Sequence, residues 1–141
     1  SSIPFHLSTV EFFHAVRAHL APGGVFGMNM IGDLASPLQR SVLRSLAATF
    51  SHVYIFRVPG GNHLFLATDS DSRRQLADLE GVARRLAADS SPEPSWSEIA
   101  RLLRPVDLDV GDALLLTDEF APVNNLLHQG TEQLEESAKL P

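Results

Sequence analysis

Residues 20–32, Leu-Ala-Pro-Gly-Gly-Val-Phe-Gly-Met-Asn-Met-Ile-Gly, constrain the fold of this chain more than any other stretch. Proline cannot continue a helix, so Pro22 and the glycine after it predict a tight turn that reverses the chain. Residues 25–31 are then apolar at every position except Asn29. An apolar run without polar alternation is typical of a strand covered on both faces, as in the parallel sheet of an α/β protein.

Helical patterns flank this strand on both sides. Ser8-Thr-Val-Glu11 and Ser36-Pro-Leu-Gln39 are capping-box sequences. In such a box the serine hydroxyl accepts from the N–H three residues on, and the Glu or Gln side chain reaches back to the serine N–H. Apolar residues recur with a period near 3.6 after each box, which predicts one helix from residue 8 to the proline turn and another over 36–50.

Two further strands are predicted after the second helix. Residues 53–58 and 63–68 are rich in β-branched and aromatic side chains, and the turn cluster between them predicts an antiparallel hairpin. The strands at 25–31 and 53–58 are joined through a helix, so we expect a right-handed parallel crossover. The predicted order α-β-α-β-β is a parallel sheet finished by one antiparallel strand. Further helices are predicted over 72–88 and from the capping box at Ser95, followed by a loosely helical polar tail over 129–141.

Length and charge narrow the class of protein. A chain of 141 residues is long enough for one domain with a substantial core. Its net charge of −6 argues against a nucleic-acid groove or an anionic membrane surface, and no apolar run approaches the roughly 20 residues of a membrane helix. The histidines form no H-E-x-x-H pattern, so no metal site is expected. Without cysteine or a basic N-terminal segment, we expect a cytoplasmic protein.

Three segments together resemble the spermidine-synthase family, in particular its bacterial spermidine-synthase-like branch. They are Ile3-Pro-Phe-His-Leu-Ser-Thr-Val-Glu-Phe12, Leu20-Ala-Pro-Gly-Gly-Val25 and Leu116-Thr-Asp-Glu-Phe-Ala-Pro-Val123. Many nucleotide-type methyltransferases carry the second pattern, whereas the third is the most specific. The three bracket residues 3–123. Phe120 and Asn124 stand where the family's third motif tends to have Tyr or an acidic residue.

The resemblance implies an α/β fold: the C-terminal half of a doubly wound, Rossmann-like methyltransferase-type sheet, which ends in an antiparallel hairpin and is followed by C-terminal helices. It assigns residues 1–123 to the C-terminal part of a spermidine synthase-like domain and leaves 124–141 as a polar tail. The family binds its donor, S-adenosylmethionine or decarboxylated S-adenosylmethionine, with an upstream Gly-rich loop and acidic residue. Its catalytic aspartate also lies upstream. No G-x-G-x-x-G occurs in this chain, so we expect neither a donor or cofactor site nor a catalytic residue within it.

Four residues are candidates for substrate binding. By resemblance, His6 lies near the substrate mouth; the alternative is a hydrogen-bonded loop histidine. Asn29 either faces a ligand crevice at the carboxyl end of its strand or makes a structural hydrogen bond. Asp118 and Glu119 offer adjacent carboxylates that suit a cationic amine, although an aspartate before a short turn is often a cap. Asp33, just beyond the first strand, is a weaker candidate.

Two functions compete at this stage. In the first, the intact protein transfers an aminopropyl or methyl group from an S-adenosyl donor to an amine or another nucleophile, and this chain supplies part of the acceptor side. In the second, the chain is a non-catalytic association module that retains the half-fold. In either case we expect a homo-oligomer, such as a dimer, or association with the missing N-terminal half, because the strand at 25–31 would otherwise be an open edge.

Overall fold

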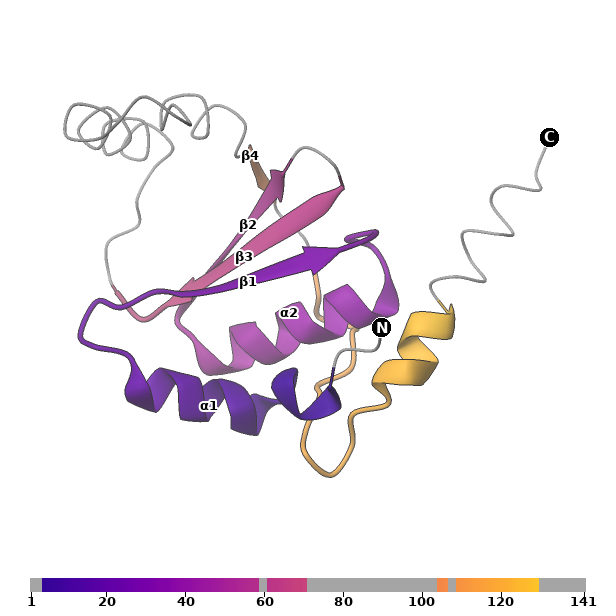
Figure 1. Ribbon diagram of the computed structural model, residues 1–141, viewed down its shortest axis with the longest axis horizontal. Coiled ribbons are helices and arrows are strands. Elements are labelled where there is room, and N and C mark those ends of the chain that lie inside the picture. The colour runs from indigo at the N-terminus through magenta and orange to yellow at the C-terminus, as the bar shows by residue number, and fades with distance from the viewer. Residues whose placement is uncertain (1–3, 59–60, 71–103, 107–108, 130–141) are drawn as a thin grey trace.

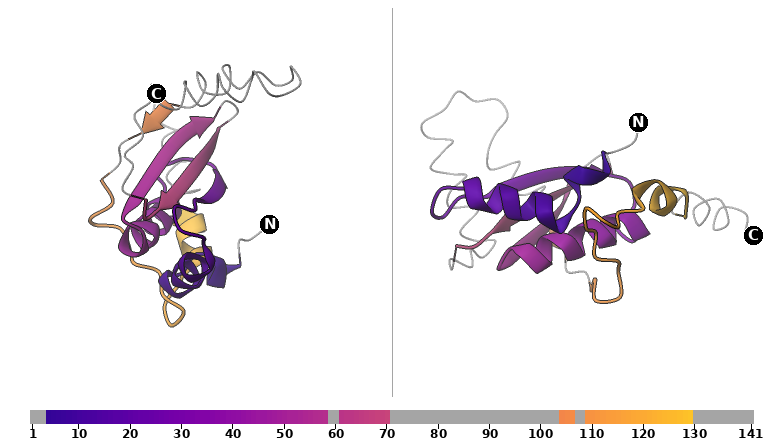
Figure 2. Two further views of the ribbon diagram at one scale, coloured as in Figure 1. Left: turned by 90° about the vertical axis from the view of Figure 1, so that its left-hand side faces the viewer. Right: turned by 90° about the horizontal axis from the view of Figure 1, so that it is seen from below.

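The structure, a computed structural model, describes residues 4–58, 61–70, 104–106 and 109–129. The elements in chain order are η1 (Phe5–Leu7), α1 (Val10–His19), β1 (Phe26–Ile31), α2 (Pro37–Thr49), β2 (His52–Val58), β3 (Asn62–Thr68) and β4 (Arg104–Val106). Residues 123–129 are also helical. Helices α1 and α2 lie side by side beneath one face of the sheet (Figures 1 and 2). The α/β class expected from the sequence is confirmed.

Helix α1 begins one residue later than the capping box predicts. Its N-cap is Thr9, whose hydroxyl accepts from the N–H of Phe12 at 3.3 Å. Ser8 is not the cap, because its hydroxyl has no hydrogen-bond partner among the described residues, and its N–H donates to the carbonyl of Phe5 in η1 at 3.1 Å. The carboxylate of Glu11 therefore does not return to Ser8 and binds another segment, described below. The predicted helix is confirmed, but the predicted Ser8–Glu11 box is wrong.

Helix α2 starts as the sequence predicts. The hydroxyl of Ser36 accepts from the N–H of Gln39 at 3.4 Å, and Pro37 lies in the first turn. The side chain of Gln39 does not reach back to Ser36, because the Ser36 N–H bonds to the carbonyl of Asp33. Instead Gln39 donates to the carbonyl of Ile31 at 3.2 Å. This bond ties the start of α2 to the end of β1.

The four-stranded sheet has the order β1-β3-β2-β4, and every neighbouring pair is antiparallel. The β2–β3 hairpin is confirmed. Strands β1 and β2 run in the same direction, but they are not neighbours, because β3 lies between them. The shared direction of β1 and β2 agrees with the expected parallel crossover through α2, but the expectation of a parallel sheet finished by one antiparallel strand is wrong, since all neighbouring strands are antiparallel. Strand β3 leaves one edge free after pairing with β2, and β1 pairs along that edge.

Burial alternates along β1 and separates two faces of the sheet. Phe26, Met28 and Met30 pack toward the helices, and Met30 is 3% exposed. Asn29 and Ile31 lie on the other face, and Ile31 is 76% exposed. In the described part of the chain, helices cover one face of this strand only. Within the described ranges, residues 25–31 are therefore covered on one face and not, as expected, on both.

The hydrophobic core lies between the sheet and the two helices. Side chains from α1, β3, α2 and the C-terminal segment meet there, and the largest fully buried apolar ones are Phe13, Phe65, Leu46, Leu116 and Val42. The aromatic rings of Phe13 and Phe26 are 6.0 Å apart and join α1 to β1. The apolar stripes predicted for both helices are thus the surfaces that build this core.

Residues 109–123, which we call the C-terminal strap, run across α2 and end against the start of α1. The helical residues 123–129 follow. Leu126, which lies in the predicted polar tail 124–141, is only 5% exposed. Strand β4 pairs with β2, at the edge of the sheet opposite β1. The helix predicted over 72–88, the helix expected from Ser95 and the tail from residue 130 lie outside the described residues.

Candidate functional site

The structure joins the first and third motif segments, which stand at opposite ends of the sequence. The N–H of Val10 donates to the carbonyl of Leu116 at 2.9 Å. The hydroxyl of Thr9 donates to Oδ1 of Asp118 at 2.6 Å, and the N–H of Asp118 donates to Oε2 of Glu11 at 3.0 Å. These three bonds connect the start of α1 to the end of the strap. In Figure 1 this junction lies at the end of the molecule to which β1 points.

Thr9 is the central residue of the junction. It is fully buried and its oxygen accepts from the Phe12 N–H, while its single proton has two acceptors in reach. The Asp118 carboxylate is 2.6 Å away and the His6 carbonyl 3.4 Å away. A hydroxyl has one proton, and a charged acceptor at the shorter distance binds it more strongly. Thr9 therefore caps α1 and holds Asp118 at the same time.

A turn presents the two carboxylates of the third motif. Thr117 and Phe120 form reciprocal backbone hydrogen bonds of 3.1 and 3.0 Å, so residues 118 and 119 lie at the tip of this turn. Its cap is Thr117, whose hydroxyl accepts from the N–H of Phe120 at 3.1 Å. Asp118 and Glu119 are both exposed. The Asp118 carboxylate is thus held from outside its own turn, by Thr9.

The strap is anchored along α2 as well. The hydroxyl of Ser45 donates to the carbonyl of Ser41 and accepts from the N–H of Leu116, both at 3.0 Å, within the core. Arg40 forms an ion pair with Asp112, and Arg44 donates to the carbonyl of Ala113 at 2.7 Å. The third motif therefore reaches α1 on a segment that helix α2 fixes at several points.

A cavity of about 370 Å³ opens between the two joined segments. Seven residues line it: Pro4, Phe5, Ala121, Pro122, Val123, Asn124 and Asn125. Five of these have apolar side chains and two have amides, and none is charged. Sequence reasoning did not select this lining or Thr9. The only available signal was that Thr9, Phe5 and Pro122 belong to the quoted motif segments.

His6 lies beside this cavity without lining it. It belongs to η1, and its ring packs edge-on against Phe5 with a centroid separation of 5.6 Å. The imidazole is exposed and forms no hydrogen bond with any residue the structure describes. His6 thus lies near the junction, and its place at a substrate mouth stays a prediction.

Asn29 and Asp33 are not brought together with the carboxylates of the third motif. Asn29 lies opposite Leu64 on the exposed face of the sheet, and no hydrogen bond joins its amide to a described residue. The expectation that this amide is buried is wrong, since that face of β1 is open. Asp33 accepts from the N–H of Ala35 at 3.0 Å and so shapes the loop before α2.

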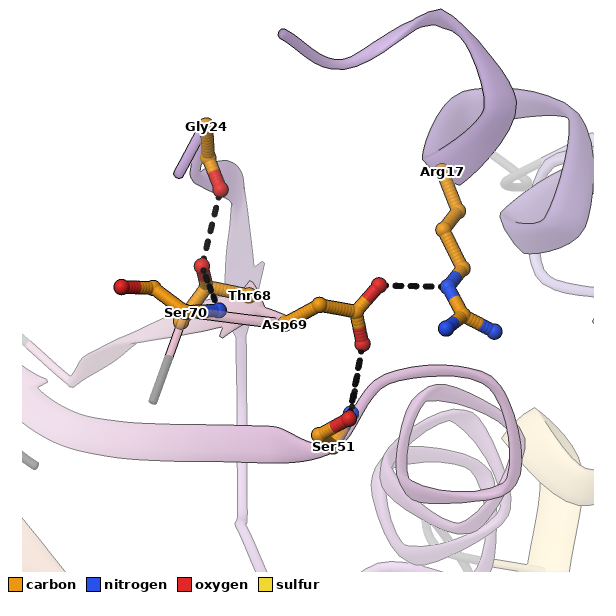
Figure 3. A network of polar contacts seen from close by, with 6 residues as sticks. All are labelled: Arg17, Gly24, Ser51, Thr68, Asp69 and Ser70. Atoms are coloured by element: carbon orange, nitrogen blue, oxygen red, sulfur yellow. Dashed lines mark hydrogen bonds and ion pairs between the residues drawn. The ribbon is translucent and has the colours of Figure 1, made fainter. Parts of the chain in front are cut away.

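A second polar network lies at the opposite end of the sheet (Figure 3). The carboxylate of Asp69 accepts from the N–H and hydroxyl of Ser51 at 3.0 and 2.9 Å and from Nε of Arg17 at 2.5 Å. The Ser51 N–H above all, and then Arg17, lower the pKa of Asp69 below its usual value. The hydroxyl of Thr68 donates to the carbonyl of Gly24 at 2.8 Å. This network fastens α1 and the turn before β1 to the hairpin.

Among the described residues, no group of three or more His, Cys, Asp or Glu side chains is arranged to hold a metal ion. None of the described helices is long and apolar enough to cross a membrane.

Comparisons with known proteins agree with the motif resemblance. No family model matches the chain. A curated relative, the "Probable polyamine aminopropyl transferase" of Bifidobacterium longum (strain NCC 2705), is 29% identical over 147 residues, which cover 94% of this chain and 33% of the relative. A probable spermidine synthase from Corynebacterium glutamicum ATCC 13032 has a solved structure with a TM-score of 0.45 and 21% identity, covering 81% of this chain and 46% of that one. This chain therefore spans about a third of the length of its curated relative and is similar to that part of it.

Proposed function

We propose that this chain is part of an aminopropyl transferase and forms the acceptor side of its active site. The observation that carries the proposal is the junction itself. Two motif segments from opposite ends of the chain are bound to each other through Thr9, Glu11 and Asp118, and a cavity opens between them. The name of the curated relative supports aminopropyl transfer as the reaction, and no comparison supports the alternative of a non-catalytic association module.

In the proposed reaction, the nitrogen of a neutral amine attacks a methylene carbon bonded to the sulfonium sulfur of the donor. The N–C bond forms while the C–S bond breaks, and the electron pair of the broken bond stays on sulfur as a neutral thioether. The nitrogen then loses a proton to a carboxylate or to water. The protein contributes the alignment of nitrogen, carbon and sulfur, and it removes water from the reacting atoms.

The residues of this chain fit the acceptor and not the donor. Asp118 and Glu119 are exposed carboxylates on a fixed turn, and a carboxylate is the natural partner of an ammonium group. His6, beside the cavity mouth, adds a polar group to the same region. The sequence has no Gly-rich loop of the kind that receives the polar end of a nucleoside donor. We therefore assign the donor, decarboxylated S-adenosylmethionine, to a part of the intact protein outside this chain.

The test uses the intact protein encoded by the gene. The protein is incubated with an amine and either decarboxylated S-adenosylmethionine or S-adenosylmethionine, and the nucleoside products are measured by mass spectrometry. Aminopropyl transfer releases methylthioadenosine from the first donor. Release of S-adenosylhomocysteine from the second donor would show that the reaction is methyl transfer and not aminopropyl transfer. If the intact protein is folded but forms neither product with any amine, the proposal is wrong.

A further inference from the structure

We propose that Glu11 is a positioning residue of the site: its carboxylate holds the backbone N–H of Asp118 and so fixes where the Asp118 carboxylate lies. The contact itself does not depend on any reaction. Its effect on acceptor binding rests on the proposed function, in which Asp118 contacts the amine. The sequence assigns Glu11 to a capping box with Ser8, and in the structure its carboxylate is bound to the third motif instead.

Asp118 is held at two different atoms by residues from the start of α1. Its N–H donates to Oε2 of Glu11 at 3.0 Å, and its Oδ1 accepts from the hydroxyl of Thr9 at 2.6 Å. Thr9 is the N-cap of α1 and Glu11 lies in the first turn, so both belong to the same ordered helix start. The Glu11 contact fixes the main chain of Asp118, and the Thr9 contact fixes its carboxylate.

A third contact completes the attachment of this segment. The N–H of Val10 donates to the carbonyl of Leu116 at 2.9 Å, so residues 9–11 bind the strap at residues 116 and 118. The turn over 117–120 is also closed on itself by reciprocal backbone bonds. A rigid turn that is held at two points can still rotate about the line through them, whereas a third point fixes its orientation. Glu11 provides one of these three points.

Glu11 is better suited than Thr9 to a test of positioning. Thr9 is fully buried and caps α1, so its substitution also changes the core and the helix start. Glu11 is exposed, and within the described ranges its carboxylate is the acceptor for the Asp118 N–H. A carboxylate in the first turn also interacts favourably with the helix dipole. A loss of stability alone would therefore not show that Glu11 positions Asp118.

Two substitutions separate the hydrogen bond of Glu11 from its charge. Glu11→Gln removes the negative charge at the helix start but keeps a side-chain oxygen that can accept from the Asp118 N–H. Glu11→Ala removes both the charge and the acceptor. If the charge alone matters, the two variants behave alike. If positioning matters, the glutamine variant retains the behaviour of the unsubstituted protein.

Steady-state kinetics of the intact protein measure the consequence for the acceptor. Glu11→Ala is expected to raise the acceptor KM about three- to tenfold, as the loss of one hydrogen bond would, with the donor KM and kcat nearly unchanged. Glu11→Gln is expected to stay within about twofold of the unsubstituted protein. Equal increases in both variants, or an increase in neither, would overturn the proposal.

A double substitution tests whether Glu11 acts through Asp118. If Glu11 only places the Asp118 carboxylate, its removal has little further effect once that charge is gone. The variant with both Glu11→Ala and Asp118→Asn is therefore expected to have the acceptor KM of Asp118→Asn alone, within about twofold. If the two effects multiply, Glu11 acts independently of Asp118 and the proposal is wrong.

Hydrogen exchange tests the contact without any substrate. Mass spectrometry of peptides that cover residues 116–120 follows backbone amide exchange in the intact protein. Glu11→Ala is expected to speed exchange of the Asp118 amide, because its acceptor is lost, and Glu11→Gln is expected to preserve its protection. Unchanged exchange in the alanine variant would show that Glu11 does not hold this amide.

The outcomes separate this inference from the proposed function. If Glu11→Ala deprotects the Asp118 amide but the intact protein transfers no aminopropyl group, Glu11 holds the turn and the proposed reaction is wrong. If the intact protein is active while Glu11→Ala changes neither the exchange nor the acceptor KM, the reaction stands and the role of Glu11 is wrong.

Discussion

The hydroxyl of Thr9 donates to the carboxylate of Asp118 at 2.6 Å, across 109 positions of the sequence. One residue is the buried N-cap of α1, and the other is an exposed member of the third motif. The stability of the helix start and the position of a candidate substrate carboxylate therefore depend on the same side chain. Substitutions at the two ends of this bond have different expected effects.

Replacement of Thr9 by valine is expected to lower the free energy of unfolding by about 1–3 kcal/mol. The variant keeps the shape of the side chain but loses the N-cap acceptor and the donor to Asp118. Urea denaturation measures the change. Thr9→Ser, which keeps the hydroxyl, is the control and is expected to retain most of the stability. Equal losses in both variants would assign the effect to the packing of the methyl group.

Replacement of Asp118 by asparagine is expected to preserve the fold and weaken acceptor binding in the intact protein. The amide oxygen still accepts from Thr9, but the charge that we assign to the amine contact is gone. Loss of a charge-assisted contact of about 1.5–3 kcal/mol raises the acceptor KM at least about tenfold and leaves the donor KM nearly unchanged, where KM follows binding. Steady-state kinetics test this. Glu119→Gln distinguishes the two neighbouring carboxylates. An unchanged acceptor KM in the Asp118 variant would show that Asp118 only binds Thr9 and does not contact the amine.

The network around Asp69 predicts a dependence of stability on acid pH. The N–H of Ser51 and the guanidinium of Arg17 lower the pKa of Asp69 from its ordinary 3.8, so the folded state favours the ionised carboxylate. This stabilisation is present above the unfolded pKa and is lost as the pH falls through the lower folded pKa. Asp69→Asn is thus expected to lower the urea midpoint at about pH 7 and to make little difference at about pH 2. A constant difference at both pH values would contradict this assignment.

The outer edge of β1 is expected to promote self-association. Strand β1 pairs with β3 only, so its other edge has no strand partner in the part of the chain that the structure describes. An apolar edge without Lys or Pro is a template for pairing with another chain. Ile31→Lys, at a residue 76% exposed on β1, should reduce the apparent mass at micromolar concentration in sedimentation experiments. Leu114→Lys, at an exposed residue of the strap, is the control; a wild-type chain that sediments as a monomer would contradict the prediction.

The isolated 141-residue chain is expected to turn over no S-adenosyl donor. Its sequence lacks the Gly-rich loop, and the family's catalytic aspartate is expected upstream of residue 3. Mass spectrometry of the chain with donor and amine tests this. Methylthioadenosine or S-adenosylhomocysteine above the level of a heat-treated sample would show that the chain carries its own donor site.

The sequence predicted those elements whose signals are local. Proline at the start of α2, the Ser36 cap and the periodic apolar residues of both helices act within a few positions, and the structure contains them. The cap of α1 lies one residue later than predicted, because Ser8 ends the 3₁₀ turn η1 and Thr9 is the first residue free to cap α1. A short 3₁₀ turn before a helix leaves no clear mark in a pattern of apolar residues.

Features that depend on distant partners were harder to predict. Strand β3 lies between β1 and β2 because each of its edges pairs with one of them. The apolar sequence of a strand does not indicate which other strand it pairs with. The candidate residues were identified one at a time, whereas the junction depends on Thr9, a residue whose partner lies near the other end of the chain. Charge and motif alone therefore suggested Asp118 but not what holds it.

The order of the sheet also affects how the chain is assembled on the ribosome. Strand β1 is the first strand of the described sheet to be synthesised, but its partner β3 is synthesised after β2. The β2–β3 hairpin closes a short loop and pays little entropy to do so, whereas β1 has to wait for the finished hairpin. The nascent chain thus carries an apolar strand without a partner while two further elements are made. During that interval β1 is open to pairing with a chaperone or another nascent chain, before the protein's own β3 is available to it.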